Sequence, residues 1–78
     1  MTKMEGNRME RAEFLESSVL QSASYDETIN LLTVTFKSGR SYDFFDVPPS
    51  IWEEFKKAES KGRFFTQNIK GKFKPRGL

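Results

Sequence analysis

Apolar and polar residues alternate in three segments of the first half of the chain, and each segment predicts a β-strand. The alternation is clearest at residues 30–36, where threonines separate the apolar side chains. It is weaker at residues 17–25, which we expect to form a first strand, and short at residues 41–45, which we expect to form a third. Gly39, in the polar stretch between the last two segments, predicts a hairpin turn with a positive φ.

The two-residue period of a strand also predicts which side chains share a face. From the first strand to the third, the expected sets are Val19, Gln21, Ala23 and Tyr25, then Leu32, Val34 and Phe36, then Tyr42 and Phe44. The aromatic pair on the third strand has two interpretations. It is either core beneath the helices, which we favour because the domain has few other residues to bury there, or a platform on which bases stack.

The pattern changes to a helical period after two prolines, and we expect a helix over residues 50–59. Ser50 and Glu53 have the spacing of a capping box. An earlier cap with a proline in the first turn is the alternative.

A second helix is expected over residues 63–69, ending before Gly71. Phe65 and Ile69 lie four residues apart, so they can pack together on the side of the core. Another face of this helix carries Arg63, Gln67 and Lys70, each one turn from the next.

These elements predict a single α+β domain, with a three-stranded antiparallel sheet followed by two short helices packed on one face. We expect the domain to cover residues 15–74. Residues 1–14 are expected to be a flexible lead-in, with a short helical turn around residues 9–15, and residues 75–78 a C-terminal tail. Phe14 and Leu15 are the first residues able to anchor to a core.

The composition excludes several classes of chemistry. The 78 residues include no Cys and no His, which removes disulfides, thiolate zinc sites, cysteine catalysis and imidazole catalysis. No apolar run approaches the roughly 18 residues of a membrane span, so no membrane partner is expected. The polar N-terminal residues do not resemble an export signal, and we expect the cytoplasm as compartment.

An enzyme is not expected, and neither is a cofactor. Asp43 and Asp46 are close enough in sequence to hold a metal or share a proton, which is what an enzyme here would need. The favoured alternative is a strand residue followed by a turn residue. The glycines match neither a phosphate-binding loop nor a dinucleotide fingerprint.

The net charge of +2 hides a strong asymmetry. Residues 1–60 carry seven basic and eleven acidic side chains, a sum of −4, whereas residues 61–78 carry six basic side chains and no acidic one, a sum of +6. A segregated basic end is typical of proteins that bind a polyanion. The alternative is a solvated basic tail that only aids solubility.

Basic and aromatic residues interleave in this basic end, a combination that suits single-stranded nucleic acid or RNA. The expected phosphate contacts are Lys61, Arg63, Lys70, Lys72 and Lys74, and the candidate rings are Tyr42, Phe64 and Phe73. For Phe65 a core position is favoured because of its spacing to Ile69. Phe64 and Phe73 can equally be core residues.

The order of several short motifs resembles the KTSC domain, a family named for the C-terminal extension of some lysyl-tRNA synthetases. The motifs are Ser17-Ser18, Tyr25-Asp26, Phe36-Lys37-Ser38-Gly39, Val47-Pro48-Pro49, Ser60-Lys61-Gly62-Arg63-Phe64-Phe65 and Asn68-Ile69-Lys70-Gly71. The family's Tyr-x-Tyr motif stands here as Tyr42-Asp43-Phe44, without the second hydroxyl. The resemblance implies a small domain, also found free-standing in bacteria and phages, for which RNA binding has been suggested.

Two functions remain open at this stage. The first is a non-enzymatic nucleic-acid-binding module, with RNA before DNA as its partner. The second is a protein–protein interaction module of a bacterial or phage assembly. It predicts an exposed apolar patch and binding that survives charge reversal at Lys70 and Lys72.

Overall fold

The computed structural model describes residues 9–73 and 75–77, which form a five-stranded sheet and a helical layer. The elements in chain order are β1 (Met9–Glu13), β2 (Leu20–Asp26), β3 (Leu31–Phe36), β4 (Ser41–Phe44), α1 (Pro49–Lys57), α2 (Lys61–Phe64), the π-helix η1 (Phe65–Lys70) and β5 (Pro75–Gly77). The prediction of an α+β fold with an antiparallel sheet and two helical segments is confirmed. The predicted number of strands is wrong, because four strands precede the helices and a fifth follows them.

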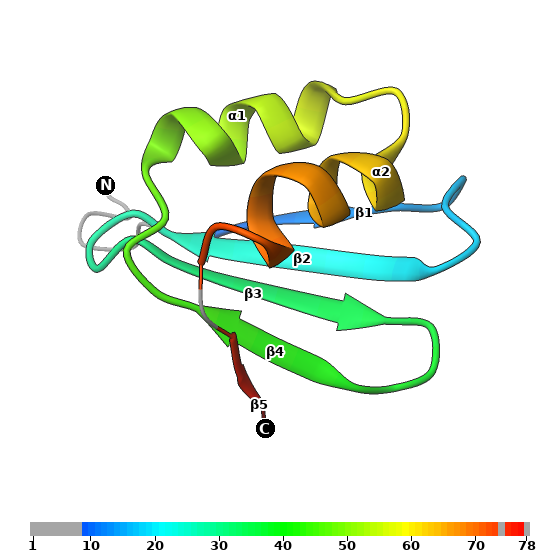
Figure 1. Cartoon of the computed structure of the whole chain (residues 1–78), viewed down its shortest axis with the longest axis horizontal. Helices are drawn as coiled ribbons and strands as arrows, with labels where there is room; N and C mark the ends of the chain where they lie inside the picture. The colour runs from blue at the N-terminus through cyan, green and yellow to red at the C-terminus, as the bar shows by residue number, and fades with distance from the viewer. Residues whose placement is uncertain (1–8, 74, 78) are drawn as a thin grey trace, which may run out of the picture.

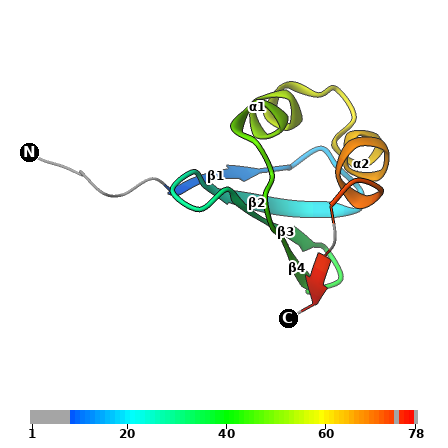
Figure 2. The same cartoon turned by 60° about the vertical axis from the view of Figure 1, so that its left-hand side comes forward.

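The five strands lie side by side in chain order, and every neighbouring pair is antiparallel. Both helices lie over the same face of this sheet (Figures 1 and 2). No other element of the described chain lies over the opposite face. That face carries short polar side chains, which bond to one another through Thr33 to Asp43 at 2.8 Å and Thr35 to Ser41 at 2.9 Å.

The two edge strands lie beyond the bounds that we expected for the domain. Residues 9–13 form β1, which pairs with β2, so the predicted helical turn near residue 9 is wrong. Residues 75–77, expected as a tail, form β5 along β4. The rest of the expected lead-in, residues 1–8, lies outside the described residues.

A β-bulge explains why the predicted alternation of the first strand was incorrect. The register between β2 and β3 shifts between Leu20 and Ser22, which inserts one extra residue into β2. Leu20 and Ala23 therefore both face the core although they are three residues apart, while Val19 and Gln21 are exposed. In β3, which has no shift, Leu32 and Val34 share the buried face as predicted.

Helix α1 begins two residues earlier than the capping-box pattern predicts. Its N-cap is Pro48, without a side-chain hydrogen bond, and Pro49 occupies the first turn. The earlier start with a proline in the first turn is therefore correct, and proline is suited to this position because its φ is already helical. The helix buries Trp52 and Phe55 against the sheet.

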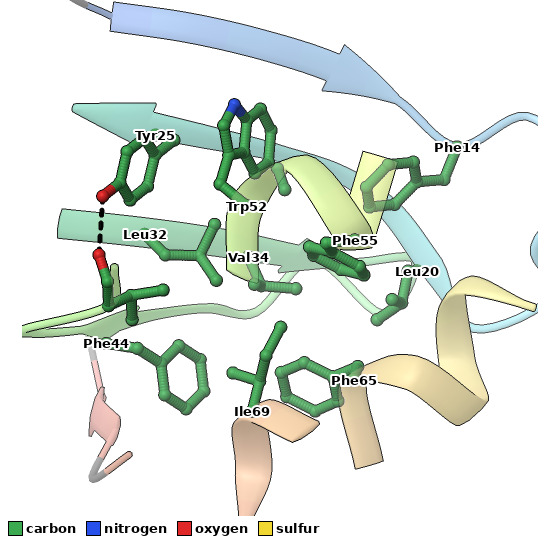
Figure 3. Packing of buried hydrophobic residues seen from close by; sticks show 12 residues of the cluster. Phe14, Leu20, Tyr25, Leu32, Val34, Phe44, Trp52, Phe55, Phe65 and Ile69 are labelled. Atoms are coloured by element: carbon green, nitrogen blue, oxygen red, sulfur yellow. Dashed lines mark hydrogen bonds between the residues drawn. The ribbon is translucent and has the colours of Figure 1, made fainter. Parts of the chain in front are cut away.

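The core is a single apolar layer between the sheet and the helices (Figure 3). Phe65 and Ile69, predicted to pack together, are both buried, and the ring of Phe65 meets that of Phe44 at 5.5 Å. Phe14 is buried as expected, whereas Leu15 is 83% exposed. The second helical segment is thus fixed to the sheet by its apolar side, which leaves its polar side free to line a site.

Candidate functional site

A groove lies between the β3–β4 hairpin and the α2–η1 segment. Figures 1 and 2 show α2 over the end of the sheet at which β3 turns back into β4. The groove has a volume of about 830 Å³ and is open to solvent. Its lining is Val19, Leu20, Phe36, Ser38, Arg40, Tyr42, Phe44, Gly62, Arg63, Phe65, Thr66, Gln67 and Lys70.

The floor of this groove is aromatic. Phe36 contacts Tyr42 edge to face, with ring centroids 5.7 Å apart at 87°, and meets Phe65 at 5.4 Å. Phe44 and Phe65 are buried, but Phe36 and Tyr42 are only half-buried. These last two rings, which we call the aromatic corner, therefore present apolar surface to whatever enters the groove.

Three cations surround the aromatic corner from two walls. Arg40 comes from the β3–β4 turn, and Arg63 and Lys70 come from the helical segment. All three side chains are exposed, and none forms an ion pair within residues 9–73. No carboxylate is among the residues that line the groove, so its potential is positive.

Polar residues of α2 and η1 line one wall of the groove, namely Arg63, Thr66, Gln67 and Lys70. A π-helix of six residues follows α2 without a break, since Phe64 and Phe65 both have right-handed helical φ and ψ. The hydroxyl of Thr66 donates to the carbonyl of Gly62 at 3.0 Å. π-Helical turns are rare and are frequent at functional sites. The prediction that Arg63, Gln67 and Lys70 share a face agrees with their common place in the groove.

The structure brings together three of the predicted site residues, Tyr42, Arg63 and Lys70. It adds Arg40, which the sequence analysis missed because this residue stands apart from the basic end. A signal was present, since Phe36 and Tyr42 flank the same short turn on one strand face. Two residues of that turn, Ser38 and Arg40, line the groove together with both rings.

Lys61 lies elsewhere and has another role. Its ammonium donates to the backbone carbonyls of Lys56 at 2.9 Å and Ala58 at 2.5 Å, and lies 5.7 Å from the ring centroid of Phe14. The last carbonyls of a helix have no partners within it, so Lys61 caps α1.

Three other predicted site residues that the structure describes, Phe64, Phe73 and Lys72, do not line the groove either. Phe64 stacks on Phe55 with ring centroids 5.5 Å apart, and Phe73 packs half-buried against the core. Lys72 is exposed just beyond η1. Lys74 lies outside the described residues.

The acidic pair, Asp43 and Asp46, is joined by no third metal ligand among the described residues. Asp43 accepts the hydrogen bond from Thr33 on the face opposite the helices, and Asp46 lies in the following loop with φ 62°. Within residues 9–73 and 75–77, no three acidic residues gather as ligands for a metal ion. In the same part of the chain, no helix has the length and hydropathy needed to cross a membrane.

A second groove lies between the β1–β2 loop and the loop that joins α1 to α2, with a volume of about 860 Å³. Two apolar side chains at this groove are exposed, Leu15 at 83% and Val19 at 53%. Glu16 and Glu59 also line it. It is therefore more acidic than the first groove and carries the apolar surface that an interaction module would need.

Comparison with known proteins places the fold in a family. The model of the KTSC domain matches residues 16–73. The crystal structure of a KTSC domain protein from Yersinia pestis is similar with a TM-score of 0.80 and 38% identity, over 90% of this chain and 97% of that one.

The curated relatives are of two kinds. A lysine–tRNA ligase of Nostoc punctiforme is 48% identical over 59 residues, which are 76% of this chain and 10% of the ligase. The chain thus spans about a tenth of the length of that relative. A protein of Tsukamurella paurometabola is 35% identical over 60 residues, 77% of this chain and 90% of that protein. With a family model that covers most of the described residues and a solved relative of the same fold, this chain belongs to the KTSC domain family.

Proposed function

We propose that this domain is a non-enzymatic RNA-binding module of the cytoplasm, and that the groove between the β3–β4 hairpin and η1 is its binding site. The observation that carries the proposal is the aromatic corner, which three cations without ion pairs in residues 9–73 surround. Cations neutralise phosphates and release counterions, and rings stack on bases. The two kinds of group occur here in one concave site.

The choice of RNA over DNA is supported by the relatives. The ligases of Nostoc punctiforme and Trichormus variabilis that contain a similar segment act, by their name, on a tRNA. An RNA-binding segment would be useful in such an enzyme. That association gives a preference for RNA and says nothing of the contacts.

The geometry changes the set of residues to which we assign phosphate contacts. Arg63, Lys70 and Lys72 stay in the proposal, and Arg40 joins them. Lys61 leaves it, because its ammonium is already bonded to two backbone carbonyls.

The test is fluorescence anisotropy with a labelled single-stranded RNA at low salt. We expect a dissociation constant of at most tens of micromolar, since binding that depends on a few phosphate contacts is weak. Arg63→Glu and Lys70→Glu should each weaken binding about tenfold. Lys57→Glu makes the same charge change at an exposed position of α1 that lines neither groove. This variant should change the dissociation constant less than twofold. No binding by the unmodified chain, or equal losses in all three variants, would refute the proposal.

A protein–protein interaction module is the second candidate, and the exposure of Leu15 and Val19 beside the second groove favours it. Under this function, Leu15→Ser abolishes partner binding. Charge reversal at Lys70 and Lys72 leaves it intact. Under the RNA-binding function, Leu15→Ser leaves RNA binding intact, and charge reversal at Lys70 and Lys72 weakens it.

A further inference from the structure

The geometry of the aromatic corner suits one base rather than a row of stacked bases. Its two half-buried rings, Phe36 and Tyr42, are nearly perpendicular at 87°. A base that lies flat on one ring meets the edge of the other, so a second base cannot continue the same stack. Proteins that bind several successive bases instead offer a series of rings along a strand of nucleic acid.

The walls of the groove require that this base be unpaired. The rings lie on the floor of a concave site, with Arg40 on one wall and Arg63 and Lys70 on the other. The bases of an A-form duplex are stacked inside the helix, and its major groove is too deep and narrow for side chains to read. Only a base that leaves the stack can reach Phe36 and Tyr42.

One residue that lines the groove has an amide side chain, which can read the edge of such a base. Gln67 is exposed on the helical wall, and its amide forms no hydrogen bond with another residue of 9–73. An amide offers a donor and an acceptor side by side, as the edge of a base does. The neighbouring hydroxyl of Thr66 is already bonded to Gly62, and the hydroxyl of Ser38 offers a single group.

We infer that the groove holds a single unpaired nucleotide, whose base lies against Phe36 and Tyr42 while Gln67 reads its edge. The flanking phosphates then lie on Arg40 and Arg63, one on each wall. This inference rests on the proposed RNA-binding function and goes beyond it, because it names the part of the RNA that is recognised and the residue that gives preference among bases.

Three RNA hairpins distinguish the contribution of the base to binding from that of the phosphates. The first has one bulged nucleotide, the second has an abasic residue at the bulge, and the third is fully paired. A single bulge is preferable to a single-stranded oligomer, because on an oligomer the domain can move to a neighbouring base. In anisotropy titrations at low salt, we expect the first hairpin to bind about tenfold or more tightly than the other two, as the loss of one stacked base predicts.

The outcomes distinguish this inference from the proposed function. If the abasic and bulged hairpins bind within twofold of each other, RNA binding stands and the single-base site is wrong. If no hairpin and no single-stranded RNA binds at tens of micromolar, both are wrong.

The role of Gln67 is tested with the four bulged bases A, C, G and U. For the unmodified chain, the dissociation constants of the four hairpins should differ by about fivefold or more, as expected for an amide that pairs with a base edge. Gln67→Ala should reduce the spread to within twofold and leave binding of the abasic hairpin unchanged. Gln21→Ala, at an exposed glutamine of β2 that lines neither groove, should keep the spread. A spread that survives Gln67→Ala overturns the assignment.

Discussion

The hydroxyl of Tyr25, at the end of β2, donates a 2.6 Å hydrogen bond to the backbone carbonyl of Val47, in the loop between β4 and α1 (Figure 3). The same hydroxyl lies 3.0 Å from Oδ1 of Asn30, and the amide of Val47 donates to the carbonyl of Asn30 at 3.0 Å. The ring of Tyr25 stacks on Trp52 with centroids 5.7 Å apart. One side chain therefore fixes the loop that leads from the sheet into the helical layer.

Tyr25→Phe should lower the free energy of unfolding by about 1–3 kcal/mol. The substitution keeps the ring but leaves the buried carbonyl of Val47 without its donor, and an unsatisfied buried acceptor costs about this much. The measurement is urea unfolding followed by the fluorescence of Trp52, the single tryptophan. Tyr42→Phe is the matched control, since the Tyr42 hydroxyl makes no hydrogen bond within residues 9–73. The free energy of unfolding of Tyr42→Phe should lie within about 0.5 kcal/mol of that of the unmodified chain. Equal losses in both variants would contradict the assigned bond.

The same tyrosine should make the fold sensitive to alkali. Burial raises the pKa of Tyr25 above its ordinary value of 10.0, and the charges of Glu27 and Asp26 add to this. Because the folded pKa is raised, the folded chain keeps the proton longer than the unfolded chain. This contribution to stability is complete below pH 10 and is lost as the pH rises through the folded pKa. Unfolding between pH 9 and 11 should therefore show a smaller alkaline loss for Tyr25→Phe than for the unmodified chain. If stability falls equally with pH in the two proteins, the raised pKa of Tyr25 is contradicted.

Strand β1 should be sensitive to acid, because Glu10 holds it to α1. One oxygen of Glu10 accepts from Nε1 of Trp52 at 2.6 Å and from the Lys56 ammonium at 2.9 Å. The hydrogen bond from Trp52, and then that from Lys56, lower the pKa of Glu10. The stabilisation is therefore present at a pH above the pKa of Glu10 in the unfolded chain, which is near 4.5. It is lost as the pH falls through the pKa of Glu10 in the folded chain.

Glu10→Gln tests this attachment. Since the Glu10 side chain is 55% exposed, solvent screens the pair and we expect a loss of about 0.5 kcal/mol at pH 7. The difference from the unmodified chain should vanish at a pH well below 4. A difference that stays constant from pH 7 to acid would show that the charge of Glu10 does not matter.

The sequence predicted those parts of the fold whose signal is local. The threonine-separated apolar residues of β3 and the four-residue spacing of Phe65 and Ile69 gave their buried faces correctly. Strand β1 has no such signal, since four of its five residues are exposed. It is a strand because β2 offers it an edge, and that partnership is a tertiary effect which overrides local pattern.

The candidate site was predicted in part for the same reason. Arg63, Gln67 and Lys70 share a helix face, which the helical period shows. Arg40 meets them only because the hairpin folds beneath η1, and no spacing along the chain encodes that approach. Conversely, Lys61 looked like its basic neighbours, but the end of α1 binds its ammonium.

Two glycines should respond to alanine in opposite directions. Gly39 in the β3–β4 turn has a φ of 100°, which an L side chain rarely adopts, so Gly39→Ala should cost about 1 kcal/mol or more. Gly62 lies in α2 with open space where a Cβ would be, and alanine is the better helix former, so Gly62→Ala should stabilise by about 0.5–1 kcal/mol. Urea unfolding measures both. A Gly39→Ala variant as stable as the unmodified chain would mean that the turn changes its conformation.

The salt dependence of RNA binding should reveal whether Arg40 touches phosphate. For single-stranded nucleic acid, the logarithm of the binding constant falls with the logarithm of salt concentration by about 0.7 per neutralised phosphate. Contacts from Arg40, Arg63, Lys70 and Lys72 predict a slope of about −2.8 between 50 and 200 mM salt. Arg40→Ala should reduce the size of this slope by about 0.7, and Lys57→Ala should leave it unchanged. If Arg40→Ala has no effect while Lys72→Ala lowers the slope, the phosphates lie along the C-terminal segment rather than across the groove. Arg40 is the decisive residue because it is a cation of the groove that the basic end of the chain does not supply.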